Sequence, residues 1–175
     1  MSRVATAALV SPVPRSDARL VLQARMGSSR LPGKVLARLG GRSVLAHCMD
    51  RLTAARVGEL VVATTTRPED DAVVEEATRA GVRVVRGPVD DVLGRFVLAV
   101  ADWDGPYVIR ATADNPLVDV EASARVLRAL DQGADYCVED GLPVGAAVEA
   151  VRTEVLRDAA ALDGASGSVE CAFED

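Results

Sequence analysis

QARMGSSRLPGK, the stretch from Gln23 to Lys34, combines glycines, serines and basic residues, and it is the part of the sequence from which we predict the fold. It follows the apolar run 20–22 and precedes a predicted helix, as a loop at the end of a buried strand does. Its glycines allow a bend whose backbone N–H groups can turn toward an anion. Arg25, Arg30 and Lys34 add positive charge at the same place. The simplest ligand for such a loop is a polyphosphate.

Lys34 is the only lysine among the 20 basic residues of the chain. An ammonium is a compact point charge, whereas arginine presents a planar fork, so a lysine kept at this loop favours a phosphate ligand. The alternative is that the position of a single lysine is chance. The loop differs from the known phosphate motifs: five residues separate Gly27 from Gly33, Val35 replaces the P-loop hydroxyl, and G-x-G-x-x-G is absent.

Composition narrows the class of protein. A chain of 175 residues with 49% apolar and 3% aromatic residues predicts one domain with a core of Val, Leu and Ala, which suits strands covered on both faces. The net charge of −6 argues against a nucleic-acid partner. No run is long enough to span a membrane. We expect residues 1–18 to form a mobile N-terminal extension and 19–175 to form a single domain.

The cysteines and the histidine predict neither a metal centre nor a hydrolytic triad. Cys48, Cys137 and Cys171 show no C-x-x-C spacing and are odd in number, so thiols in a reducing cytoplasm are expected. His47 lies within a helical pattern, where a packed or surface histidine is the expected role.

Hydrophobic periodicity predicts strands alternating with helices. The predicted strands are 19–24, 59–64, 82–85, 107–111 and 134–138, with an extended segment at 148–151. The predicted helices are 43–54, 69–80, 90–101, 120–130 and 154–162. Such alternation predicts an α/β fold: a doubly wound, mostly parallel sheet with helices on both faces.

Polar stretches follow three of the predicted strands, where ligands of parallel sheets bind. Asp114, in RATADNPLVD, can hold Mg²⁺ against a phosphate oxygen, or can form an Asx-turn with its own backbone. The threonines of ATTTRPEDD, 64–66, can line a base pocket or make a capping turn. The pairs Asp70-Asp71 and Asp90-Asp91 more often mark helix N-termini than metal sites.

VLQARMGSSRLPGKVL (21–36) resembles the signature of the cytidylyltransferases that activate acidic sugars. The closest pattern is the spore coat polysaccharide biosynthesis type, related to the synthetases of CMP-Kdo and CMP-sialic acid. GPVDDVLGRF, RATADNPLVD and PVGAAVEAV resemble three further blocks, so the resemblance runs from about Leu20 to Val151.

The resemblance implies a nucleotide-diphospho-sugar transferase-like fold of the GT-A type, and attack by an acceptor oxygen on the α-phosphate of CTP with release of pyrophosphate. It implies a small acidic acceptor, Mg²⁺ as cofactor and a possible homodimer. The implied catalytic residues are Arg30, Lys34, Arg110 and Asp114, with Asp114 as metal ligand. The implied nucleotide contacts are Gln23, Ala24, Arg25, Met26, Gly27, Ser28, Arg30, Lys34, Ala63, Thr64, Thr65 and Asp91. The acceptor side is expected at Arg110, Asn115 and Glu149.

The sequence also departs from the family pattern. Ala147 stands where the fourth block has an aspartate, and 169–172 replaces an R-E-H-V-like stretch. In the family a later segment supplies a second metal carboxylate. Here Glu170, Glu174, Asp175 or a partner chain could substitute for it, or the second carboxylate could be absent. Two alternatives stay open: a nucleotide-binding module without catalysis, and a sugar-nucleotide-dependent glycosyltransferase. The latter needs a D-x-D metal motif after a strand, and no predicted strand is followed by one.

Overall fold

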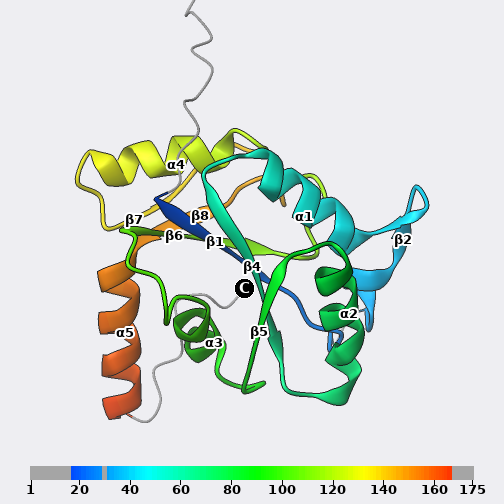
Figure 1. Cartoon of the computed structure of the whole chain (residues 1–175). Coiled ribbons are helices and arrows are strands. Elements are labelled where there is room, and N and C mark those ends of the chain that lie inside the picture. Colours follow the sequence, from blue (N-terminus) through cyan, green and yellow to red (C-terminus); the bar gives the residue numbers. More distant parts are fainter. Residues whose placement is uncertain (1–16, 29–30, 167–175) are drawn as a thin grey trace, which may run out of the picture.

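The computed structural model describes residues 17–28 and 31–166. Its main feature is a six-stranded sheet in the order β5-β4-β1-β6-β8-β7 (Figure 1). The strands are β1 (Ala18–Gln23), β4 (Gly58–Thr65), β5 (Arg83–Gly87), β6 (Tyr107–Thr112), β7 (Tyr136–Val138) and β8 (Glu149–Arg152). The first four of these pair in parallel, and β8 runs antiparallel to both of its neighbours. The predicted mostly parallel sheet is confirmed.

The described part of the chain has five α-helices packed against the sheet: α1 (Val44–Ala54), α2 (Asp71–Arg79), α3 (Val92–Ala99), α4 (Ala122–Asp131) and α5 (Thr153–Ser166). Two short 3₁₀ turns, η1 (Lys34–Leu36) and η2 (Pro68–Asp70), precede α1 and α2. A small hairpin, β2 (Arg38–Leu39) with β3 (Arg42–Ser43), projects beside α1 (Figure 1). None of the described helices is both long and apolar enough to cross a bilayer.

Side-chain alternation along the strands separates two layers of core. Leu20 and Leu22 of β1 pack with residues of α1, α2 and α4, whereas Val21 packs with α3 and α5. Successive side chains of a strand point to opposite faces, and both faces here are covered, so β1 is apolar at every position from 20 to 22. Figure 1 shows α3 and α5 next to each other on their side of the sheet. The predicted doubly wound fold is therefore confirmed.

Local signals placed several boundaries correctly. Ser43 caps α1 by accepting a hydrogen bond of 3.0 Å from the Ala46 N–H. Gly81 follows α2 with φ of +73°, the conformation that glycine favours after a helix. The β2–β3 hairpin was not predicted, because two-residue strands leave no periodic pattern. β7 is shorter than predicted and begins at Tyr136, and β1 begins one residue early, at Ala18.

Arg19 organises the end of the sheet opposite the predicted site. Its buried guanidinium donates to the carbonyl of Ala99, to Asp102 at 2.6 Å and to Glu59 at 2.5 Å, and it lies 4.8 Å from the ring centre of Trp103. Asp102 belongs to the D-x-D triplet 102–104, which follows α3 rather than a strand. Because Asp102 pairs with arginines at the amino end of the strands, this triplet does not supply the metal motif of a glycosyltransferase.

The single histidine and two of the cysteines lie in packing environments within the fold. His47 lies on α1 with its Nε2 2.8 Å from the Leu39 carbonyl of the hairpin, as expected for a packed residue. Cys48 and Cys137 are free, and burial raises the pKa of the Cys48 thiol to about 12. Cys171 lies outside the described residues.

Candidate active site

The polar stretches singled out in the sequence meet at one edge of the sheet. In the parallel register Gln23 is level with Ala63 on one side and with Thr112 on the other, so the loops after β1, β4 and β6 leave the sheet together. Glu149 joins them from the start of β8, because that strand runs antiparallel to β6 and pairs it with Arg110. The carboxyl edge of the sheet is therefore the candidate active site.

The loop after β1 is closed by backbone hydrogen bonds. The Gly33 N–H donates to the Met26 carbonyl at 2.9 Å. Gly33 has a φ of +73°, a backbone conformation that is strained for a residue with a side chain. At its start the Ala24 N–H donates to the Ala63 carbonyl at 3.0 Å. The bond between Gly33 and Met26 encloses the predicted contacts Gly27 and Ser28, and the predicted contact Arg25 comes directly before Met26. Arg30, predicted as catalytic, lies outside the described residues.

Asp70 holds this loop in place, a role that sequence reasoning missed. Its buried carboxylate accepts a hydrogen bond of 2.6 Å from the Met26 N–H and a second from the Thr65 hydroxyl. Asp70 lies at the N-terminus of α2, as the sequence predicted, but its side chain makes no capping bond to that helix and turns to the loop instead. The only available signal was a carboxylate a few residues beyond a strand end, and the loop it contacts is distant in sequence.

Lys34 and Asp114 form an ion pair across the mouth of the site. The Lys34 ammonium lies 2.5 Å from a carboxylate oxygen of Asp114, and both side chains are about one-third exposed, at 34% and 38%. Burial would raise the pKa of Asp114, but hydrogen bonds from Lys34 and Thr112 outweigh it and hold the pKa below its ordinary value. The charged form of Asp114 is thus maintained beside the loop, as a metal ligand or phosphate-site carboxylate requires.

Arg110 of β6 and Glu149 of β8 form a second ion pair, between these two neighbouring strands. Both are mostly buried, and Glu149 also accepts a hydrogen bond of 3.0 Å from the Tyr136 hydroxyl. Burial, followed by the charge of Glu149, raises the pKa of Tyr136 to about 12, so the phenol keeps its proton. These three side chains line a pocket that continues over apolar residues of α3, β6, β8 and α5: Val92, Leu93, Phe96, Val108, Ala150, Val151 and Leu156.

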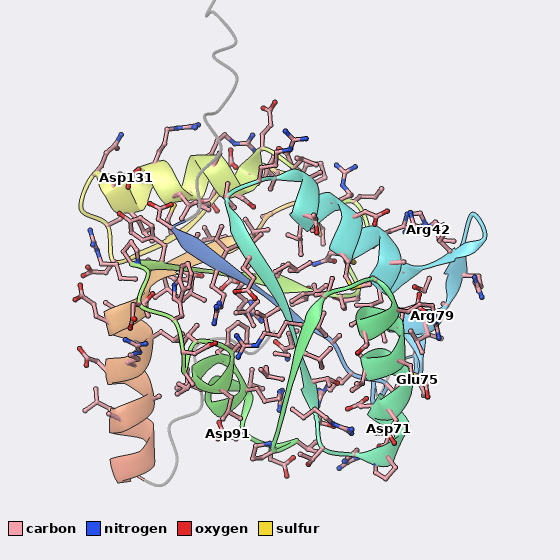
Figure 2. All side chains as sticks on the ribbon, viewed as in Figure 1. Arg42, Asp71, Glu75, Arg79, Asp91 and Asp131 are labelled. Atoms are coloured by element: carbon pink, nitrogen blue, oxygen red, sulfur yellow. The ribbon has the colours of Figure 1, made fainter. Side chains whose placement is uncertain are left out.

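The remaining predicted contact residues differ in burial and in the hydrogen bonds that they already make. Thr64 is fully buried, so its side chain does not reach the surface of the site, and the Thr65 hydroxyl is engaged by Asp70. Any base contact from these two residues therefore falls to their backbone. Asn115 donates to the Thr112 hydroxyl at 2.8 Å in the turn that also carries Asp114. Asp91 caps α3 through the Gly94 N–H at 2.5 Å; Figure 2 shows it beside that helix.

A bound magnesium ion would be coordinated by the carboxylate of Asp114 and by phosphate oxygens of the substrate. Among residues 17–28 and 31–166, no group of three or more His, Cys, Asp or Glu side chains is placed to hold a metal. Mg²⁺ commonly binds through one or two carboxylates together with substrate phosphates, so an exposed, ionised Asp114 beside a phosphate-type loop fits such an ion. The predicted substitutes for a second carboxylate, Glu170, Glu174 and Asp175, lie outside the described residues.

A doubly wound sheet that carries a glycine-bent cationic loop opposite an ionised carboxylate defines a nucleotide-binding domain of the nucleotidyltransferase type. The chain belongs to the cytidylyltransferase family, whose sequence model matches residues 20–167. It is 37% identical to the spore coat polysaccharide biosynthesis protein SpsF of Bacillus subtilis over 149 residues, which is 82% of this chain and 62% of SpsF.

Further relatives agree with this assignment. A 3-deoxy-manno-octulosonate cytidylyltransferase of Anaeromyxobacter sp. is 31% identical over 120 residues, covering 66% of this chain and 48% of that protein. The structure of a cytidylyltransferase from Leptospira borgpetersenii superposes with a TM-score of 0.76 at 28% identity, covering 85% of this chain and 65% of that one. The chain thus spans less than two thirds of the length of these relatives.

Proposed function

We propose that this chain transfers CMP from CTP to an acidic sugar or related acceptor, with release of pyrophosphate. The observation that carries the proposal is the Lys34–Asp114 pair, which places one cation and one carboxylate at the mouth of a closed, glycine-bent loop. Family membership and the similarity to a 3-deoxy-manno-octulosonate cytidylyltransferase support the choice of nucleotide and of acceptor class.

The order of the strands supports an arrangement of the two substrates along the edge of the sheet. The ends of β4 and β5 lie on one side of the β1 loop, and β6 and β8 lie on the other. With the triphosphate on the central loop, the base falls toward β4 and β5, and the acceptor falls toward Arg110 and Glu149. In this arrangement the α-phosphate lies between the nucleoside and the acceptor, where the transfer occurs.

The Lys34–Asp114 pair is suited to exchange partners when the triphosphate binds. In the free chain each charge neutralises the other at 2.5 Å. A triphosphate offers Lys34 several oxygens, and leaves Asp114 available for Mg²⁺, which would neutralise charge on the phosphates when bound. Lys34 and the backbone N–H groups of the loop hold the phosphate chain in a fixed position. Positioning of this kind accounts for much of the catalysis of phosphoryl transfer.

The Arg110–Glu149 pair is suited to an acidic acceptor. Arg110 carries the positive charge that an acceptor carboxylate requires, and Glu149 with Tyr136 fixes its direction. The acceptor hydroxyl then attacks the α-phosphorus of CTP, which forms one P–O bond and breaks the bond to the β-phosphate oxygen. The β- and γ-phosphates depart as pyrophosphate, and the hydroxyl proton is lost to solvent or to a neighbouring base.

The direct experiment measures pyrophosphate release from CTP and Mg²⁺ with a panel of sugar acids, with acceptor-free reactions as the control. Acceptor-dependent release confirms the proposal. Tight CTP binding without release for any acceptor would favour the alternative, a nucleotide-binding module without catalysis. Absence of CTP binding would contradict both.

A homodimer and a cytoplasmic location, expected from the sequence, belong to the same proposal. Analytical ultracentrifugation of the purified chain tests the first, and fractionation of the source cells tests the second. A monomer at micromolar concentration would remove the dimer from the proposal without affecting the chemistry.

A further inference from the structure

The pocket beside the Arg110–Glu149 pair is polar at one end only. Strands β6 and β8 pair Arg110 with Glu149 in their register. Two residues further along the same strands, the register pairs Val108 with Val151. Residues two apart in a strand share a face, so both pairs lie on the face that α3 and α5 cover. Each residue of a strand adds about 3.3 Å, so the valine pair lies about 6–7 Å from the charged pair.

The end of the pocket away from the charged pair is lined by carbon. Val108 and Val151 line it from the sheet, and Val92, Phe96 and Leu156 line it from α3 and α5. Val108, Phe96 and Leu156 are at most 5% exposed, whereas the two other valines are half-buried. Among the described residues that line this end, none has a polar side chain. A ligand group that enters here therefore meets no hydrogen-bonding side chain.

The free space over this lining is small, about the size of one water molecule or one methyl group. An ordered water molecule needs roughly two to four polar partners, which a carbon lining does not provide. A hydroxyl group placed here would lose its hydrogen bonds to water without replacement. A methyl group loses none, and its burial removes apolar surface from water. The pocket therefore suits a ligand that is charged at one end and carries a methyl group at the other.

We propose that the acceptor is an acid whose far end is a methyl group, with its carboxylate on Arg110 and its methyl group against Val108 and Val151. This inference rests on the proposed function, in which the acceptor lies beside Arg110 and Glu149. It adds the chemical class of the acceptor: a sugar acid, or a related acid of similar length, in which a methyl group replaces the terminal hydroxymethyl group. The charged end and the carbon-lined end together fix the direction in which the acceptor lies.

The test compares two acceptors that differ only at the far end. One is 3-deoxy-manno-octulosonate, which ends in CH₂OH, and the other is its 8-deoxy analogue, which ends in CH₃. Pyrophosphate release at saturating CTP and Mg²⁺ gives kcat/KM for each acid. Apolar pockets discriminate between groups of this size by roughly 10–200-fold, so the 8-deoxy acid is expected to be preferred about tenfold or more.

Val151→Thr tests the lining itself. The substitution keeps the β-branched shape and places a hydroxyl group where the carbon lining faces the acceptor, so the preference for the 8-deoxy acid is expected to fall several-fold. Val84→Thr is the matched control, because Val84 is also a half-buried strand valine, but it lies on β5 and packs on the other face of the sheet. The control is expected to keep the wild-type preference. A purely structural effect of Val151→Thr would change the rates with both acids together.

Methyl signals in NMR spectra keep the inference testable if neither acid is turned over or if Val151→Thr does not fold. Wild-type protein is labelled at its valine methyl groups and mixed with CTP, Mg²⁺ and the 8-deoxy acid. The signals of Val108 and Val151 are expected to shift when the acid is added. Those of Val62 and Val73, which pack on the other face of the sheet, are expected to stay in place. This measurement requires no turnover and no variant.

The outcomes separate this inference from the proposed function. If both acids release pyrophosphate with equal kcat/KM, or if the signals of Val108 and Val151 do not move, the space is only loose packing between α3 and α5. The inference is then wrong, while transfer to another acid remains open to the acceptor panel described above. If wild-type protein does not bind CTP, the proposed function fails, and the inference that depends on it fails too.

Discussion

The carboxylate of Asp70 accepts a hydrogen bond of 2.6 Å from the backbone N–H of Met26, 44 positions earlier in the chain. Its second oxygen accepts from Thr65, so one buried side chain fastens the loop after β1 to the end of β4. Both structures belong to the proposed nucleotide site. Asp70 is therefore positioned to keep the phosphate side and the base side in fixed relation.

Asp70→Ala is expected to loosen the loop and to destabilise the fold. The substitution leaves two buried donors without their acceptor, each at a cost of about 1–3 kcal/mol. Chemical denaturation should show the loss of stability, and titration calorimetry should show weaker CTP binding. Asp70→Asn, which keeps one acceptor oxygen for Met26, is the control and should be affected less. Wild-type CTP affinity in a folded Asp70→Ala protein would contradict the positioning role.

Lys34→Ala is expected to weaken CTP binding at least tenfold, since a charge-assisted phosphate contact contributes roughly 1.5–3 kcal/mol. Cytidine, which lacks the phosphates, should bind equally well to both proteins. The matched control is Arg42→Ala on the β2–β3 hairpin, where an exposed arginine pairs with Asp50 away from the site (Figure 2). Unchanged CTP affinity in Lys34→Ala would count against the proposed function.

Asp114→Asn is expected to abolish Mg²⁺-dependent pyrophosphate release while the fold is kept. The amide preserves the shape and the turn, but removes the negative charge that pairs with Lys34 and that would hold the ion. Activity is measured over a Mg²⁺ titration, and circular dichroism checks the fold. Wild-type turnover in this variant would leave Asp114 with the turn-forming role alone.

Tyr136→Phe is expected to raise the KM for the acceptor several-fold and to leave the KM for CTP unchanged. The substitution removes the hydroxyl that donates to Glu149 at 3.0 Å, so the carboxylate that directs Arg110 loses one of its two supports. The apolar ring and the pocket are retained. An equal change in both KM values would mean that the hydroxyl acts on the fold rather than on the acceptor side.

Acid unfolding is expected to depend on Asp102. Hydrogen bonds from Arg83 and Arg19 lower the pKa of Asp102 from 3.8 to about 2. A lowered folded-state pKa contributes stability that is present above pH 4 and is lost as the pH falls toward 2. Asp102→Asn should therefore be less stable than wild type at pH 7, with a flatter dependence of unfolding free energy between pH 4 and 2. Parallel pH profiles for the two proteins would refute this linkage.

Much of the fold followed from local pattern. The apolar run 20–22 with its polar loop predicted a buried strand feeding a site, and β1 ends at Gln23 as that pattern requires. Ser43 and Gly81 marked helix ends because capping chemistry acts within a few residues. The β2–β3 hairpin escaped prediction, since its strands are too short to repeat a pattern.

Some residues of the candidate site were also predicted from the sequence, and others were not. Lys34 and Asp114 were each named from their sequence stretches, and the structure brings them within 2.5 Å. Asp70 was correctly expected at a helix N-terminus, but its bonds to Met26 and Thr65 were not foreseen because these partners lie at other strand ends. Arg95 was not singled out, because an arginine in a helical pattern is typical of a surface residue. Both are nearly fully buried.

The amino-acid sequence by itself determined the alternation of strands and helices, the chemistry of the Gln23–Lys34 loop and the family, since each depends on residue types at short spacing. Only the tertiary structure decided which oxygens and nitrogens meet: the two bonds of Asp70 and the Arg110–Glu149 pair across antiparallel strands. Such contacts join positions far apart in the chain, and burial gives them their energy, so no local pattern encodes them.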